Sequence, residues 1–157
     1  MRAFASVIIP LVLLALAPAV SAQSSLSADH EFVTGDVTVT TLSETAISGE
    51  FSGDIEGPFT TDIIESIVIE TPFGSFGLIT GESTIETANG TITTEDHIAL
   101  IPLGTSGSTF WLGRHFITNA EGDCGVILTL GAFESSEEPF MLHYIGVICT
   151  EESESKD

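Results

Sequence analysis

The feature that most constrains this 157-residue chain is a two-residue alternation of apolar and polar side chains, interrupted at short intervals by glycine. After residue 22 no apolar pattern recurs at helical spacing over three turns. Alternation over short runs is typical of β-strands, and the 15 glycines indicate turns between them. The pattern predicts an all-β protein, either an eight-stranded antiparallel closed barrel or, alternatively, a β-sandwich.

Eight β-rich runs are the expected strands. They cover residues 36–42, 45–56, 60–70, 75–87, 91–102, 109–118, 124–132 and 140–149. We expect residues 35–150 to form one barrel domain, because a chain of this length is enough for a single core. Residues 23–34 are interpreted as a flexible lead-in and residues 151–157 as an acidic, disordered tail.

The first 22 residues have the order of a secretory signal peptide. Arg2 supplies a positive charge, residues 7–20 are almost wholly apolar, and small residues end the segment at Ala22. The apolar run is shorter than the roughly 20 residues that span a bilayer. We therefore expect cleavage after Ala22 and a secreted or periplasmic protein. An uncleaved membrane anchor is the alternative.

The net charge excludes two classes of partner. The chain has 23 acidic residues against three Lys and Arg, which gives a formal net charge of −20. Such a charge repels phosphate backbones and anionic lipids, so we expect neither nucleic-acid binding nor membrane binding after signal cleavage. The acids are scattered singly, as on a hydrated surface, and salt would screen their repulsion. Cationic partners and divalent ions remain compatible with this charge.

Cys124 and Cys149 are the two cysteines, and two cysteines in an exported domain usually form a disulfide. Two buried free thiols are the alternative. If the two residues face one another across a hairpin, Leu130 faces His143 at the third pair further along the same face. That face is apolar except at His143, which supports the pairing.

The dipeptide Asn89-Gly90 between two β-rich runs predicts a two-residue type I′ turn, because both residues tolerate positive φ. The turn pairs Ala88 with Thr91 and fixes the register of the hairpin. Asp96 then lies on the face that carries the isoleucines, whereas the other face carries the glutamates. Asn89 also begins an N-glycosylation sequon, which has meaning only in a eukaryotic host.

Asp96 and His143 are the candidate catalytic residues, because these two registers place them on apolar faces. A carboxyl and an imidazole inside a barrel lumen could act as acid and base on a bound ligand. For each residue the alternative is a structural hydrogen bond, or a bulge that turns the side chain outward.

Trp111, Arg114, Phe116 and Tyr144 are the candidate ligand-binding residues. Aromatic side chains gather in the last third of the chain, where they could line an apolar cavity or fill the core. Arg114 could hold an anion in a pocket or form a surface ion pair. The four histidines lack a metal-binding spacing, and no phosphate-binding, dinucleotide-binding or calcium-binding loop is present, so no metal and no cofactor are expected.

Four glycine-spaced segments carry a resemblance to a known family. They are Ser-Gly-Glu-Phe-Ser-Gly at 48–53, Asn-Gly-Thr-Ile-Thr at 89–93, Arg-His-Phe-Ile-Thr at 114–118 and Tyr-Ile-Gly-Val-Ile-Cys at 144–149. Over about 100 residues the chain resembles the small secreted β-barrels grouped with allene oxide cyclase and the dirigent proteins. The resemblance implies an eight-stranded barrel with an apolar lumen, often assembled as a homo-oligomer.

Some members of that group steer cyclisations by confining a reactive conformer of an apolar substrate. No catalytic residue of any member matches a position here, and the glycine-rich loop of many relatives is replaced by residues 119–123. Two functions are therefore expected. The first is an exported barrel that binds a small apolar ligand in its lumen, with or without cyclase or isomerase activity. The alternative is a non-enzymatic, acidic surface or matrix interaction protein.

Overall fold

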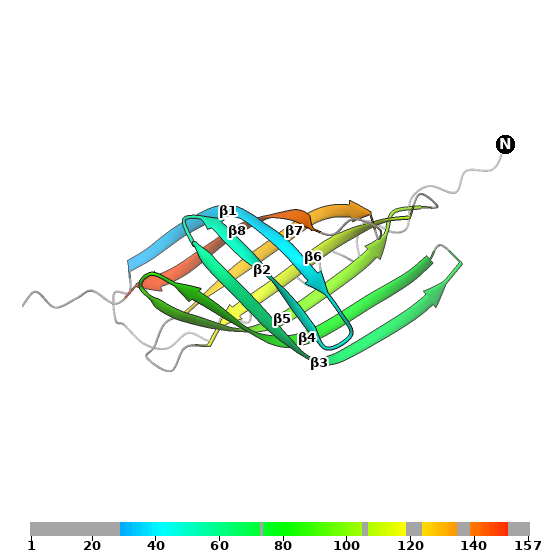
Figure 1. Ribbon diagram of the computed structural model, residues 1–157, viewed down its shortest axis with the longest axis horizontal. Helices are drawn as coiled ribbons and strands as arrows, with labels where there is room; N and C mark the ends of the chain where they lie inside the picture. The colour runs from blue at the N-terminus through cyan, green and yellow to red at the C-terminus, as the bar shows by residue number, and fades with distance from the viewer. Residues whose placement is uncertain (1–28, 73, 105–106, 119–123, 135–138, 151–157) are drawn as a thin grey trace, which may run out of the picture.

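The computed structural model describes residues 29–72, 74–104, 107–118, 124–134 and 139–150. In this part of the chain, eight antiparallel strands follow one another around a closed barrel, and the last strand pairs with the first (Figure 1). The predicted barrel is confirmed, and closure of the sheet rules out the β-sandwich. None of the described residues belongs to a helix that is long and apolar enough to cross a membrane. The expected signal peptide and the expected acidic tail lie outside the described residues.

Each predicted run corresponds to one strand. The strands are β1 (Asp29–Leu42), β2 (Ala46–Gly53), β3 (Gly57–Thr71), β4 (Gly74–Thr87), β5 (Gly90–Pro102), β6 (Ser108–Ile117), β7 (Gly125–Glu134) and β8 (Phe140–Thr150). The prediction of a flexible lead-in up to residue 34 is wrong from Asp29 onward. These residues pair with β8, and Val33 is buried in the core, so the start of β1 is anchored.

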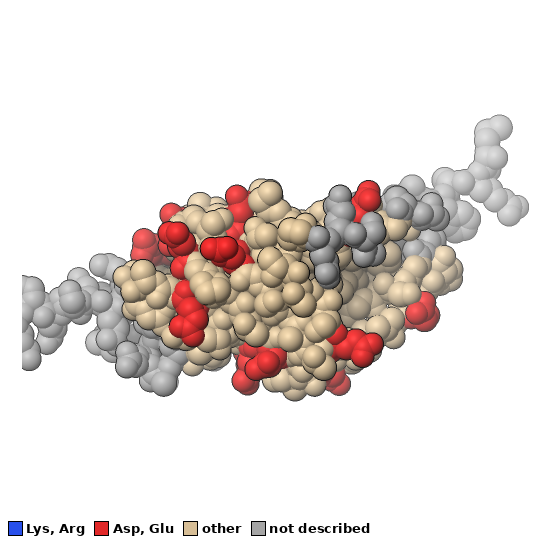
Figure 2. Space-filling view, in the orientation of Figure 1, with Lys and Arg blue, Asp and Glu red and all other residues tan. Residues whose placement is uncertain are grey.

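Side chains that alternate along every strand fill the barrel. The largest fully buried apolar members are Val37, Val39, Ile47, Ile85, Ile127, Leu142 and Tyr144. Burying each of the aliphatic ones contributes about 1.5–3 kcal/mol relative to exposure, which makes the lumen the main source of stability. Acidic side chains are dispersed over the outer face shown in Figure 2, where no Lys or Arg is visible.

The β4–β5 hairpin has the predicted faces but a different register. Thr87 pairs with Gly90, so Ala88 and Asn89 form the turn and every pair is displaced by two residues from the prediction. Among the described residues only glycines have positive φ, and Gly90 has a φ of 132°, so the type I′ turn is wrong. A displacement by two keeps each side chain on its face, and Asp96 is therefore inside as predicted.

The β7–β8 hairpin has the register that the cysteines predicted. Cys124 and Cys149 form a disulfide with a Cα–Cα distance of 5.0 Å, and Leu130 pairs with His143. The apolar face identified from this register is, however, the outer face of the barrel. The inner face holds residues such as Ile127, which is fully buried.

Candidate functional site

The polar centre of the lumen is Asp96 on β5, whose side chain is fully buried. Its carboxylate accepts three hydrogen bonds: one from Ser83 Oγ, one from Thr94 Oγ1 at 2.6 Å, and one from His115 Nδ1 at 2.8 Å. A buried carboxylate is costly unless its oxygens are hydrogen-bonded, and here both are. The prediction that Asp96 lies inside is confirmed.

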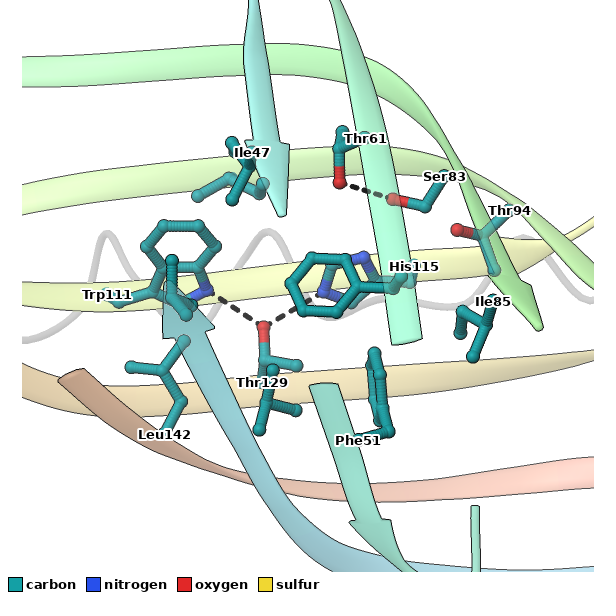
Figure 3. Close-up of a pocket in the computed structure, with 14 residues that line it drawn as sticks. Ile47, Phe51, Thr61, Ser83, Ile85, Thr94, Trp111, His115, Thr129 and Leu142 are labelled. Atoms are coloured by element: carbon teal, nitrogen blue, oxygen red, sulfur yellow. Dashed lines mark hydrogen bonds between the residues drawn. The ribbon is translucent and has the colours of Figure 1, made fainter. Parts of the chain in front are cut away.

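His115 on β6 connects this carboxylate to a second hydroxyl group (Figure 3). Its Nε2 lies 2.9 Å from Thr129 Oγ1, and Trp111 Nε1 donates to the same hydroxyl oxygen at 2.9 Å. Because the indole N–H can only donate, the Thr129 hydroxyl is free to donate its own proton to Nε2. This assigns the imidazole proton to Nδ1, which donates to Asp96.

The network continues on the other side of Asp96 and spans five strands. Thr61 on β3 lies 2.6 Å from the Ser83 hydroxyl of β4, so the Ser83 hydroxyl can accept from Thr61 while it donates to Asp96. Asp96 and His115 are directly paired residues of β5 and β6, which brings their side chains together on the inner face. None of the buried side-chain N and O atoms in the described part of the chain lacks a hydrogen-bond partner.

Gly113 makes room for this network between the side chains of Trp111 and His115. A Cβ atom at this position would meet Thr129 Oγ1, His115 Nε2 and Trp111 Nε1, all three at under 3 Å. Only the absence of a side chain at 113 therefore allows the hydroxyl, imidazole and indole groups to converge.

The order hydroxyl, imidazole, carboxylate in Thr129, His115 and Asp96 is the order of a nucleophilic triad. The surroundings do not allow that chemistry. Thr129 is 2% exposed, and the cavity that it lines has a volume of about 20 Å³. That volume holds about one water molecule and no substrate. The network therefore fastens β3, β4, β5, β6 and β7 together, and the predicted ligand in the lumen does not fit this cavity.

His143, the second candidate catalytic residue, lies on the outer face of β8, so the prediction that it points into the lumen is wrong. Its Nδ1 lies 2.5 Å from Asp36 Oδ1 on β1, and both side chains are largely exposed. The error has a physical reason: both faces of β7 and β8 are apolar, and the alternation alone does not say which of them is inside.

Two of the candidate ligand-binding residues, Trp111 and Tyr144, point into the lumen. The Tyr144 hydroxyl accepts from the Ile55 backbone N–H at 2.7 Å and donates to the Ile55 carbonyl at 3.3 Å. Burial raises the pKa of Tyr144 above its ordinary value of 10.0. Both aromatic side chains are core residues rather than walls of a lumenal ligand cavity.

The other two candidates, Arg114 and Phe116, point outward from β6. The Arg114 guanidinium lies 4.6 Å from the centre of the Phe116 ring in a cation–π contact. His97 is the direct neighbour of Arg114 on β5, and its Nε2 lies 3.3 Å from Glu95. The structure therefore separates the predicted ligand-binding set into an inner pair and an outer pair.

Arg114 of the outer pair borders a much larger cavity. A groove of about 550 Å³ lies on the outer side of β3 to β7, which we call the outer groove. Apolar side chains form most of its lining: Ile67, Leu78, Ala99, Ile101, Leu112 and Leu128. Glu65, His97 and Arg114 add charged and polar groups. Pockets that hold small ligands usually have about 300–1,000 Å³ and such a lining.

No group of three or more potential metal ligands occurs in the part of the chain that the structure describes. Searches for similar proteins found no match among family models, curated proteins or solved structures. The fold and the site therefore define the class: a small, closed, eight-stranded β-barrel with a filled lumen and an apolar groove on its outer surface.

The sequence reasoning missed His115 and the outer groove. His115 could have been found, because the alternation of β6 places it on the same face as Trp111 and Ile117. The groove had no such signal, because each of five strands contributes only one to three outward side chains to it.

Proposed function

We propose that this protein is an exported binding barrel that holds a small apolar molecule in the outer groove. The observation that carries the proposal is the contrast between two cavities: about 550 Å³ outside and about 20 Å³ inside. A ligand of drug size needs several hundred cubic ångströms, so the groove accommodates it and the lumen does not.

The lining of the groove indicates the chemistry of the ligand. Exposed Ile67 and Leu78 form a cross-strand pair on β3 and β4, with Ala99 and Leu112 paired on β5 and β6. His97 and Arg114 lie side by side at the same surface and can donate hydrogen bonds. We infer a ligand with an apolar body and a polar end that accepts hydrogen bonds.

Binding is proposed rather than catalysis. The described residues that line the groove include no Ser or Cys that could act as a nucleophile. The expected cyclase or isomerase activity remains a prediction, as does the resemblance to the allene oxide cyclase and dirigent group. The alternative of an acidic interaction module also remains a prediction.

Export rests on the signal-like order of residues 1–22 and on the disulfide between Cys124 and Cys149. Disulfides persist in oxidising compartments and are rare in the cytosol. Proteomic detection of a new N-terminus at Gln23 would test this part of the proposal.

The test of the groove uses a fluorescent apolar probe, anilinonaphthalene sulfonate, with the purified chain. Ala99→Trp places a large ring in the groove, and Ala46→Trp adds the same ring on the outer side of β2. We expect A99W to weaken probe binding by at least about tenfold, since the filled volume no longer admits the probe. A46W should bind like the unmodified chain.

Equal binding by A99W and A46W, with both variants folded by circular dichroism, would contradict the proposal. Leu78→Glu serves as a second variant in case A99W does not fold. Leu78 is 45% exposed, so a charge there leaves the core intact but makes the groove polar.

A further inference from the structure

Strands β7 and β8 are apolar on both faces, although the described part of the chain covers only one of them. Ile127 and Leu142 fill the lumen, whereas Leu128 and Ile145 point outward from the same strands. A strand with one face in water normally alternates apolar and polar residues, and strands that are apolar throughout are typical of sheets covered on both sides. The outer face of these strands therefore has the composition of a buried surface.

The strand registers join these residues into one surface. Phe116 on β6 pairs with Val126 on β7, Val126 pairs with Val147 on β8, and Val147 pairs with Phe32 on β1. Leu128 and Ile145 form the adjacent pair. We call this surface the outer patch; it consists of Phe32, Phe116, Val126, Leu128, Ile145 and Val147. Phe32 is 65% exposed and Ile145 is 42% exposed.

None of the six residues of the outer patch is acidic, although the chain has 23 acidic residues, and among the described residues the charged side chain beside it is Arg114, which pairs with Leu128. The acids begin at its margins, with Glu95 opposite Phe116 on β5 and Asp36 on β1 next to His143. The face in Figure 2 differs, because acidic side chains are spread over it. Two chains of net charge −20 repel one another wherever carboxylates face each other. Through the outer patch, two chains can approach one another without placing carboxylates against carboxylates.

This distribution of charge selects among possible occupants. A cationic partner would be drawn to the acidic faces and not to the outer patch, and an anionic lipid surface would be repelled by the chain as a whole. A second copy of the chain presents the same apolar, carboxylate-free surface. We propose that two copies associate through their outer patches in an isologous dimer.

The size of the outer patch sets the expected affinity. Four strands about 4.8 Å apart, with outward residues about 6.8 Å apart, give a contact on the order of 400–500 Å² per copy once side chains are included. A standard interface buries about 800 Å² per partner. The dimer is therefore at the weak end of the range and depends on concentration, with a dissociation constant in the micromolar range. This inference does not rest on the proposed ligand, because Leu128 is the one residue of the outer patch that also lines the outer groove.

The test is sedimentation equilibrium of the purified chain between about 1 and 200 µM, a range that brackets a micromolar dissociation constant. We expect a mass that rises from one chain to two, and tighter association in about 1 M NaCl, where the repulsion between the acidic chains is screened. Ile145→Glu puts a carboxylate in the middle of the contact in both copies. It should weaken association by at least about 100-fold, because two unpaired charges would be buried.

Ile64→Glu is the matched control, because Ile64 is 68% exposed and lies on β3, outside the outer patch. I64E should associate like the unmodified chain. Val147→Glu provides a second disruption if I145E does not fold, as judged by circular dichroism, because Val147 is exposed and does not line the outer groove. A chain that stays monomeric over the whole range would overturn the proposal, as would equal association of I145E and I64E. Monomers that float with phosphatidylcholine vesicles would show that lipid, and not a second copy, covers the patch.

Discussion

Replacement of Asp96 by alanine tests whether the lumenal network holds the barrel together. The substitution removes the acceptor of three buried hydrogen bonds, from Ser83, Thr94 and His115. A buried donor left without a partner costs about 1–3 kcal/mol, and three donors that relax around one site cost less than three times that amount. We expect a loss of about 4 kcal/mol in the free energy of unfolding. A domain of this size has about 5–15 kcal/mol in total.

The assay is urea unfolding followed by tryptophan fluorescence. Trp111 is the single tryptophan, is buried in the lumen and belongs to the same network through Thr129, so its emission reports directly on this region. Thr94→Val removes one hydrogen bond and keeps the shape, so it should cost about 1 kcal/mol and gives a readout even if D96A does not fold. Exposed Asp62 provides the control, since D62N should change stability by less than about 0.5 kcal/mol. A loss below about 1 kcal/mol for D96A would refute the structural role of the network.

Three further outcomes are expected. Replacing Cys124 and Cys149 by alanine opens a loop of 25 residues and should lower the free energy of unfolding in urea by about 3 kcal/mol, whereas an unchanged midpoint would contradict this. Tyr144 is the single tyrosine, so the ultraviolet absorbance of tyrosinate should titrate above pH 10 in the folded chain. The contribution of the buried phenol to the free energy of unfolding is fully present below pH 10 and is lost as the pH rises further, because the unfolded chain ionises first. A titration at the ordinary pKa would show that Tyr144 is not buried. Gly113→Ala should lower the thermal unfolding temperature by several degrees, since about 1–3 kcal/mol is lost when the Cβ displaces the network. G77A serves as a comparison, because Gly77 has no positive φ and a Cβ atom there meets only the Leu100 side chain, at 3.3 Å or more.

The alternation of side chains was sufficient to predict the strands and the faces of β4 and β5, because one face of those strands is apolar and the other is acidic. Asp96 was placed correctly for that reason. The exact turn was not predictable, since Ala88-Asn89 and Asn89-Gly90 keep the same faces and differ only in local backbone geometry.

The same reasoning failed at β7 and β8, where it placed His143 inside. Both faces of these strands are apolar, so the alternation contains no information on which face fills the lumen. The outer patch is the physical cause of that ambiguity, because its exposed apolar side chains alternate along the strands with the apolar side chains that fill the core. The outer groove depends on side chains from five strands, and no local pattern predicts such a surface.

The most direct test of ligand binding in the outer groove rather than the lumen is a titration of the ¹⁵N-labelled chain with the apolar probe, followed by nuclear magnetic resonance. We predict shifts of the backbone amides of Leu78, Ala99 and Leu112, while the indole N–H of Trp111 stays unchanged. Shifts centred on the Trp111 indole and the His115 amide, with Ala99 unaffected, would place the ligand inside the barrel and contradict the proposed function.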